Sequence, residues 1–170
     1  GGKYVVFVDV DDWVEPSYLA NLYQGLKIGR GVVISGYKEE RIGETLIRKN
    51  GNYYYDTNHF SEMFALHKMC TIGLPWCEMF DMSVIKEHDI KFDTNVHFSE
   101  DSLFLSDYYS CANTAVLLPN ITYNYVIHKG SLMGYEIRDV IPVWQIRERF
   151  KGDAIMTERS SRLKKRSFYD

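Results

Sequence analysis

The sequence predicts an α/β fold, and three observations near its start carry that prediction. Residues 4–8 form a continuous apolar run, which is typical of a strand buried on both faces. A helical pattern follows after an acidic loop, and a second apolar run occupies residues 32–37 beyond the break at Gly29 and Gly31. This order of strand, loop, helix and strand is the one that α/β proteins use.

The first helix is expected from Pro16 to Leu26. Proline is favoured in the first turn of a helix, and apolar residues recur after it at Leu19, Leu22 and Tyr23 with helical spacing. Residues 38–56 are charged and contain glycine, so we expect a loop or an exposed hairpin that ends in three tyrosines.

The same reasoning predicts the rest of the chain. We expect a helix over 58–69, a short buried segment over 75–80, a helix capped by Ser83 that ends at His88, and an extended piece over 90–92. The next helix should start at 99–101 and have Leu103, Phe104, Asp107 and Tyr108 on its core face. Strands over 115–118 and 122–127, separated by a turn at Pro119–Asn120, and a helix over 141–150 should follow.

Composition narrows the class of protein. The 170 residues are 45% apolar and 25% charged, as in a globular domain, and no run approaches the roughly 20 apolar residues of a membrane-spanning helix. The net charge of −3 argues against nucleic acid as a partner. Three scattered cysteines show no metal-binding spacing, and the start carries no signal peptide, so we expect reduced thiols and a cytoplasmic location.

Two compositional features each allow two interpretations. Thirteen tyrosines fit either a core of large side chains or a surface on which sugars stack. Residues 151–170 hold six lysines and arginines against three acidic residues, so this tail is either a solvated helix end or a peripheral contact with the inner face of an anionic membrane.

Three carboxylates, Asp9, Asp11 and Asp12, follow the first predicted strand. Ligands bind at this edge of open α/β sheets. Clustered carboxylates repel one another unless a cation lies between them, and Mg²⁺ or Mn²⁺ prefers such hard oxygen ligands. A helix cap would explain one of the three aspartates, but hardly all of them.

Five segments then occur in a fixed order. They are Gly2–Pro16 with its D-x-D-D-W motif, Trp76 to Phe80, Ile90-Lys91-Phe92, Glu100-Asp101 with Phe104, and Tyr123-Asn124-Tyr125 with Ser131. Together they resemble family 2 glycosyltransferases, which have the GT-A fold. The resemblance implies part of a GT-A (nucleotide-diphospho-sugar transferase) fold, a mixed sheet flanked by helices, over residues 1–135. Residues 136–170 would form a C-terminal helix and basic tail.

The resemblance also implies an activity and its residues. An inverting hexosyltransferase of polysaccharide biosynthesis would move a sugar from a nucleotide-sugar donor to a glycan or lipid-linked acceptor. Asp11 of the DXD motif would bind Mn²⁺ or Mg²⁺, and Asp9 would lie near the ribose or sugar. Asp101 would be the catalytic base, with Glu100 beside it, because a poorly nucleophilic hydroxyl needs a carboxylate to accept its proton. Without the resemblance, Glu100 and Asp101 would be read as carboxylates that match a helix dipole.

Two further residues are candidates for binding substrate. Trp76 could line the acceptor site, since an aromatic face suits the C–H surface of a sugar, or it could be a core residue. His128 could reach the donor diphosphate, or it could lie in a solvated turn.

Two other functions compete with glycosyl transfer. The chain could be a non-catalytic module that binds a sugar or a partner, because the first βαβ unit of the family is missing from this sequence. We therefore expect a fragment with little activity alone. A haloacid-dehalogenase-type phosphatase also begins with D-x-D, but it usually has Gly and then Thr or Val where Asp12 and Trp13 stand.

Overall fold

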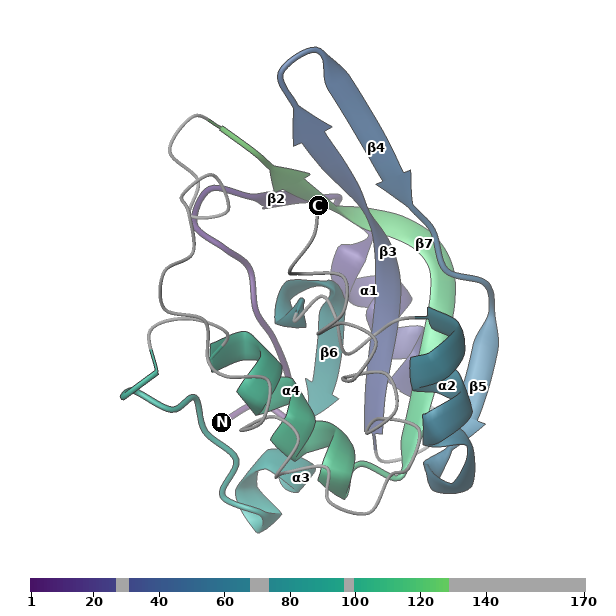
Figure 1. Cartoon of the computed structure of the whole chain (residues 1–170), viewed down its shortest axis with the longest axis vertical. Coiled ribbons are helices and arrows are strands. Elements are labelled where there is room, and N and C mark those ends of the chain that lie inside the picture. The colour runs from purple at the N-terminus through teal and green to yellow at the C-terminus, as the bar shows by residue number, and fades with distance from the viewer. Residues whose placement is uncertain (27–30, 68–73, 97–99, 129–170) are drawn as a thin grey trace, which may run out of the picture.

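The computed structural model describes residues 1–26, 31–67, 74–96 and 100–128. Seven strands form one mixed sheet between two layers of helices (Figure 1). The predicted helix over 141–150, the basic tail and the C-terminal region of 136–170 lie outside the described residues. None of the helices in the described part is long and apolar enough to cross a membrane.

The sheet has the strand order β1-β6-β3-β7-β2, with β4 paired to β3 and β5 paired to β7. Among the strands that the structure describes, the central pair of β3 with β7 is parallel, and the other pairs are antiparallel. The strands are β1 (Tyr4–Val6), β2 (Trp13–Val14), β3 (Gly31–Arg41), β4 (Glu44–Arg48), β5 (Tyr53–Asp56), β6 (Glu78–Asp81) and β7 (Thr114–Val126).

The first strand differs from the prediction. β1 spans only Tyr4–Val6, is half-buried, and pairs antiparallel with β6 at one end of the sheet. The apolar run continues to Val8, but Val8 has left the sheet and is 47% exposed. The acidic loop therefore does not follow a strand buried on both faces, because all three residues of β1 are only half-buried and the strand pairs antiparallel with β6.

The predicted turn at Pro119–Asn120 is also wrong. β7 runs without interruption from Thr114 to Val126. Its register with β3 shifts there, from Ile34 opposite Leu117 to Gly36 opposite Ile121. A proline lacks the N–H that a regular ladder needs, and a bulge of this kind accommodates it.

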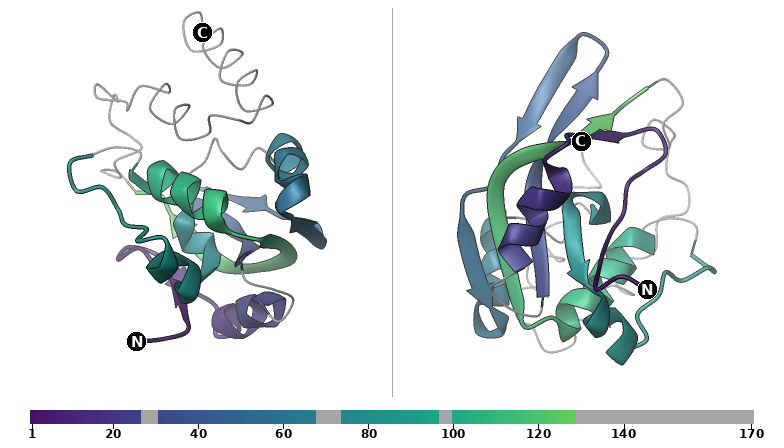
Figure 2. Two further views of the ribbon diagram at one scale, coloured as in Figure 1. Left: turned by 90° about the horizontal axis from the view of Figure 1, so that it is seen from below. Right: turned by 180° about the vertical axis from the view of Figure 1, so that it is seen from behind.

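Helices cover both faces of the sheet. α1 (Tyr18–Gly25) lies on one face, and α4 (Glu100–Cys111) lies on the other with α2 (Phe60–His67) and α3 (Met82–Glu87), as Figure 2 shows. Two short 3₁₀ turns, Thr57–His59 and Pro75–Cys77, precede α2 and β6.

Two local predictions need correction. Asp81, not Ser83, caps α3, because its carboxylate accepts the N–H of Ser83 at 2.8 Å. Leu19 and Tyr23 of α1 are 56% and 50% exposed, since Tyr18 and Leu22 provide the buried face.

Buried tyrosines join the layers by their hydroxyl groups. Tyr108 of α4 donates to the carbonyl of Gly31 at 2.7 Å and accepts the N–H of Asp81 at 2.8 Å, which ties α4 to β3 and β6. Tyr18 of α1 donates to the carbonyl of Trp76 at 2.7 Å. For these tyrosines the core interpretation of the composition is correct.

Candidate active site

The acidic loop, residues 9–12, connects β1 to β2. The N–H of Asp12 donates to the carbonyl of Asp9 at 3.2 Å, which closes a tight turn. Val10 lies at its tip and is fully exposed. This turn directs the side chains of Asp9, Asp11 and Asp12 toward different neighbours, so the three residues have different roles.

Asp12 holds the loop to β7. Its Oδ1 accepts the backbone N–H of Val126 at 2.8 Å, and its Oδ2 accepts the hydroxyl of Tyr123 at 2.7 Å. The same Tyr123 hydroxyl accepts the N–H of Asp9 at 3.1 Å. Tyr123 therefore clamps both ends of the loop. The sequence placed Tyr123 in a motif but gave it no role, because the contact spans more than 110 residues.

Asp11 lies beside His128. The two side chains are 45% and 48% exposed, and Nε2 of His128 is 3.0 Å from Oδ2 of Asp11. His128 follows the end of β7, and pairing of β7 with β2 brings that end to the acidic loop. The two residues predicted as a metal ligand and a diphosphate contact therefore meet in the fold.

Asp101 lies in the first turn of α4, next to Glu100. Burial, with smaller contributions from the charges of Glu100 and Asp9, raises the pKa of Asp101 to about 6. Asp9 is affected in the same direction, since burial and the charges of Asp12 and Asp11 raise its pKa. Asp9 and Asp101 are thus close enough to interact electrostatically, although they are far apart in the sequence.

An aromatic contact fixes the distance between the acidic loop and α4. Phe7, two residues before Asp9, packs edge-on against Phe104 with a centroid distance of 5.5 Å. Phe104 is one turn after Asp101 and also stacks on Phe92 at 4.4 Å. Each aromatic pair stabilises the fold by about 0.5–1.5 kcal/mol beyond the burial of its area. This cluster therefore helps to fix the position of Asp9 relative to Asp101.

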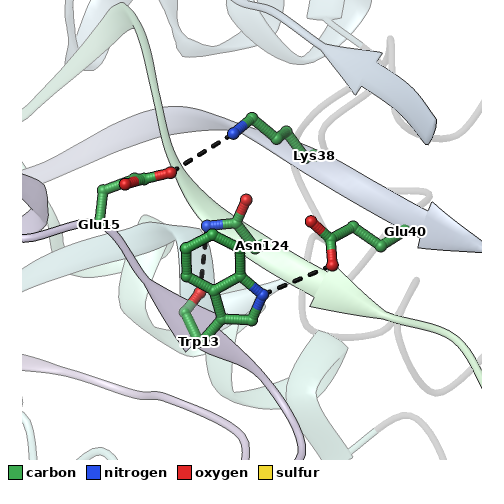
Figure 3. Close-up of polar contacts among 5 residues, drawn as sticks. All are labelled: Trp13, Glu15, Lys38, Glu40 and Asn124. Carbon is green, nitrogen blue, oxygen red and sulfur yellow. Dashed lines mark hydrogen bonds and ion pairs between the residues drawn. The ribbon is translucent and has the colours of Figure 1, made fainter.

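A second anchor fastens β2 to the sheet (Figure 3). The buried Asn124 of β7 donates from Nδ2 to the carbonyl of Trp13 at 3.4 Å, and the indole N–H of Trp13 donates to Glu40 at 3.5 Å. Lys38 pairs with Glu15 at 3.4 Å. These contacts from β3 and β7 fix the chain that leaves the acidic loop.

Trp76 is a core residue. It is 4% exposed, and its ring stacks on Tyr123 and Tyr125 at centroid distances of 4.4 and 5.1 Å. Of the two interpretations that the sequence left open for Trp76, acceptor site or core, its burial fits the core residue. Trp76 supports Tyr123, the residue that clamps the acidic loop.

The three aspartates do not form one metal cluster. In the described part of the chain no group of three or more histidine, cysteine, aspartate or glutamate side chains is placed to hold a metal ion. Both carboxylate oxygens of Asp12 already accept hydrogen bonds from β7. This corrects the prediction of a cation shared by all three carboxylates. Asp11 and His128 still offer an oxygen and a nitrogen ligand 3.0 Å apart, which fits a divalent ion whose other ligands come from a diphosphate.

Comparison with known proteins agrees with the resemblance found in the sequence. The profile of the family described as "Glycosyl transferase family 2" matches residues 1–89, more than half of the chain. EpsH from Bacillus subtilis, named as a glycosyltransferase, is 25% identical over 136 residues. The glycosyltransferase GlyA from Streptococcus pneumoniae is 26% identical over 141 residues. These alignments cover 78% and 77% of this chain but only 40% and 20% of the two relatives.

A solved structure shares the fold. TarS residues 1–349 from S. aureus, in complex with UDP-GlcNAc, superposes with a TM-score of 0.66 at 18% identity. The match covers 92% of this chain and 43% of TarS 1–349, so the chain spans less than half the length of the relatives that it matches. The mixed sheet with helices on both faces is therefore part of a GT-A fold. The chain belongs to glycosyl transferase family 2.

Proposed function

We propose that this chain is the acceptor-side part of an inverting glycosyltransferase, which moves a sugar from a nucleotide-sugar donor to a hydroxyl of a glycan or lipid-linked acceptor. The observation that carries the proposal is the placement of Asp101. A partly buried carboxylate with its pKa raised to about 6 interacts with Asp9 of the acidic loop. A general base works best when its pKa lies near the working pH.

The chemistry assigns each residue one task. Asp101 accepts the proton of the acceptor hydroxyl while the oxygen attacks the anomeric carbon. The bond from that carbon to the donor diphosphate breaks on the opposite face, so the configuration inverts. Asp9 contacts the ribose or sugar of the donor. Burial raises the pKa of Asp101, and the charge of Glu100 raises it further.

Asp11 and His128 are the residues that would hold the divalent ion. Mn²⁺ or Mg²⁺, when bound, neutralises the charge of the departing nucleoside diphosphate. The chain itself sets the positions of these two ligands. The hydrogen bonds of Asp12 with Tyr123 and Val126 hold the acidic loop, which carries Asp11, against the end of β7, which precedes His128.

The complex of TarS with UDP-GlcNAc makes UDP-sugars the first donors to test. Family 2 membership favours this proposal over the phosphatase. The binding module differs from the transferase in one respect that can be measured, since it would bind a nucleotide without transferring a sugar.

The decisive experiment is the Asp101→Asn substitution in the protein as its source organism makes it. We expect transfer from UDP-sugars to fall by at least about 100-fold, because loss of general base catalysis costs this much. Metal-dependent UDP binding, measured by calorimetry, should stay unchanged. Asp107→Asn, further along α4, is the matched control and should transfer normally. Transfer at the wild-type rate by Asp101→Asn would disprove the assignment, and UDP binding with no transfer by the wild type would favour the binding module.

A further inference from the structure

The hairpin of β3 and β4 projects beyond the helices that cover the sheet (Figure 1). Arg41 pairs with Glu44 across a two-residue connection, Ile42-Gly43, in which Gly43 takes a φ of 80°. Among the described residues β4 pairs only with β3. Its other edge therefore presents backbone N–H and C=O groups to the surroundings, which is the surface on which another strand can add.

The residues of β4 are themselves complementary to a second copy of β4. The strand reads Glu44, Thr45, Leu46, Ile47, Arg48. In an antiparallel pair centred on Leu46, Glu44 of each copy lies opposite Arg48 of the other, and Thr45 lies opposite Ile47. Opposite charges that face each other across two strands stabilise the pair, and like charges destabilise it.

Burial and orientation agree with this pairing. Glu44, Leu46 and Arg48 alternate along the strand, so they share one face of the sheet. Ile47 points to the other face and is 60% exposed, while the side chain of Arg48 is 57% exposed. Exposed edge strands are often protected from pairing by charged side chains, especially lysines. Here the two end charges are opposite, so they attract a second copy in the antiparallel direction.

We propose that two copies of this chain associate edge to edge through β4, antiparallel about a two-fold axis at Leu46. The two hairpins then form one continuous four-stranded ribbon. Because β4 has only five residues, the association is weak and depends on concentration. This proposal is independent of the catalytic site, since neither Asp11 nor Asp101 takes part in it.

The test is charge reversal, measured by sedimentation equilibrium of the whole chain. Glu44→Arg places arginines opposite each other at both ends of the pair, so we expect the dimer dissociation constant to rise by at least about tenfold. Glu62→Arg, an equal charge change on the exposed surface of α2, is the matched control and should leave the constant unchanged. A wild type that stays monomeric at every concentration, or a dimer that Glu44→Arg does not weaken, would overturn the proposal.

A mixing experiment separates pairing from misfolding. Arg48→Glu should also fail to self-associate. It removes the 4.0 Å contact of Arg48 with Glu39, and Arg41 continues to pair with Glu39 inside the hairpin. An equimolar mixture of Glu44→Arg and Arg48→Glu chains restores opposite charges at both ends, so we expect a heterodimer to form. A mixture that remains monomeric would contradict the proposed register.

Cross-linking tests the position of the axis without altering a charge. Leu46→Cys brings two thiols together at the axis, where paired Cβ atoms lie about 4.5–5.5 Å apart. We expect a covalent dimer on mild oxidation. Ile42→Cys is the control, because its two copies would lie about 26 Å apart at about 3.3 Å per residue. Equal cross-linking of both variants, or of neither, would disprove the two-fold axis at Leu46.

Discussion

Tyr123 is the residue on which the geometry of the acidic loop depends most. Its hydroxyl donates to Asp12 and accepts from Asp9, and its ring is fully buried under Trp76. Desolvation raises the pKa of this hydroxyl above its ordinary value, so it stays protonated and can donate at any physiological pH. One atom thus holds both ends of the loop that carries Asp11.

The Tyr123→Phe substitution tests this role. It removes the hydroxyl and leaves two polar groups without a partner, so we expect a loss of about 1–3 kcal/mol in the free energy of unfolding. Metal-dependent UDP binding should weaken as well, because Asp11 is no longer held. Chemical denaturation and calorimetry measure the two effects. Tyr54→Phe, at a 50% exposed position, serves as the control. Unchanged UDP binding would show that the loop keeps its shape without the clamp.

At the scale of elements, the sequence predicted correctly those helices and strands that depend on the local pattern of apolar and charged residues. The helix around 18–25 and the exposed hairpin within 38–56 were expected from spacing and charge, and both are present. The order of the strands could not be predicted this way, since pairing joins residues far apart in the sequence. The continuous β7 shows the limit clearly, because a Pro-Asn pair that normally signals a turn is absorbed in a bulge against β3.

For the candidate site, too, some features could be predicted from the sequence and others depend on tertiary pairing. Motifs identified Asp9, Asp11 and Asp101 as a set, and the fold brings Asp9 and Asp101 within electrostatic reach. The same motifs could not separate the structural role of Asp12 from that of Asp11. That distinction depends on the N–H of Val126 and the hydroxyl of Tyr123, which only tertiary pairing supplies.

The contact between Phe7, which directly follows β1, and α4 supports a prediction at this scale. Phe7 packs on Phe80, Phe92 and Phe104, so it sets the distance from the acidic loop to the first turn of α4. We expect Phe7→Leu to lower the free energy of unfolding by about 1.5–4.5 kcal/mol, because three aromatic contacts worth about 0.5–1.5 kcal/mol each are lost. Transfer should fall more than UDP binding, because Asp101, the proposed base, moves relative to the donor. Leu66→Ala, at a 62% exposed position, is the control. Equal losses in transfer and UDP binding would indicate general unfolding instead.

For the whole molecule, the dependence of stability on pH reflects a carboxyl group in the centre of the core. Glu78 on β6 is 2% exposed, and the hydroxyl of Tyr109 donates to its Oε2 at 2.9 Å. Burial raises the pKa of Glu78 to about 8, against the opposing effect of that hydrogen bond. The side chain is therefore mostly protonated in the folded protein at neutral pH and ionised in the unfolded chain.

This difference determines the direction of the effect. A carboxyl whose pKa is higher in the folded state binds its proton more tightly there, so folding is favoured at low pH and loses stability as pH rises. For Glu78 the loss extends from the ordinary glutamate pKa of 4.5 up to about 8. A single group can change the free energy of unfolding by at most about 1.4 kcal/mol per pH unit over such a range.

The Glu78→Gln substitution should remove this dependence. Glutamine keeps the shape and can still accept the Tyr109 hydroxyl, but it has no proton to lose. We expect the variant to match the wild type near pH 5 and to exceed its stability increasingly up to pH 8, as urea denaturation across that range would measure. Glu62→Gln, on the exposed surface of α2, should follow the wild-type curve. A constant difference between Glu78→Gln and the wild type at every pH would mean that Glu78 does not change its protonation on folding. The slope of the wild type would then come from the other carboxyls whose pKa is raised in the folded state, which are Asp9, Asp12 and Asp101.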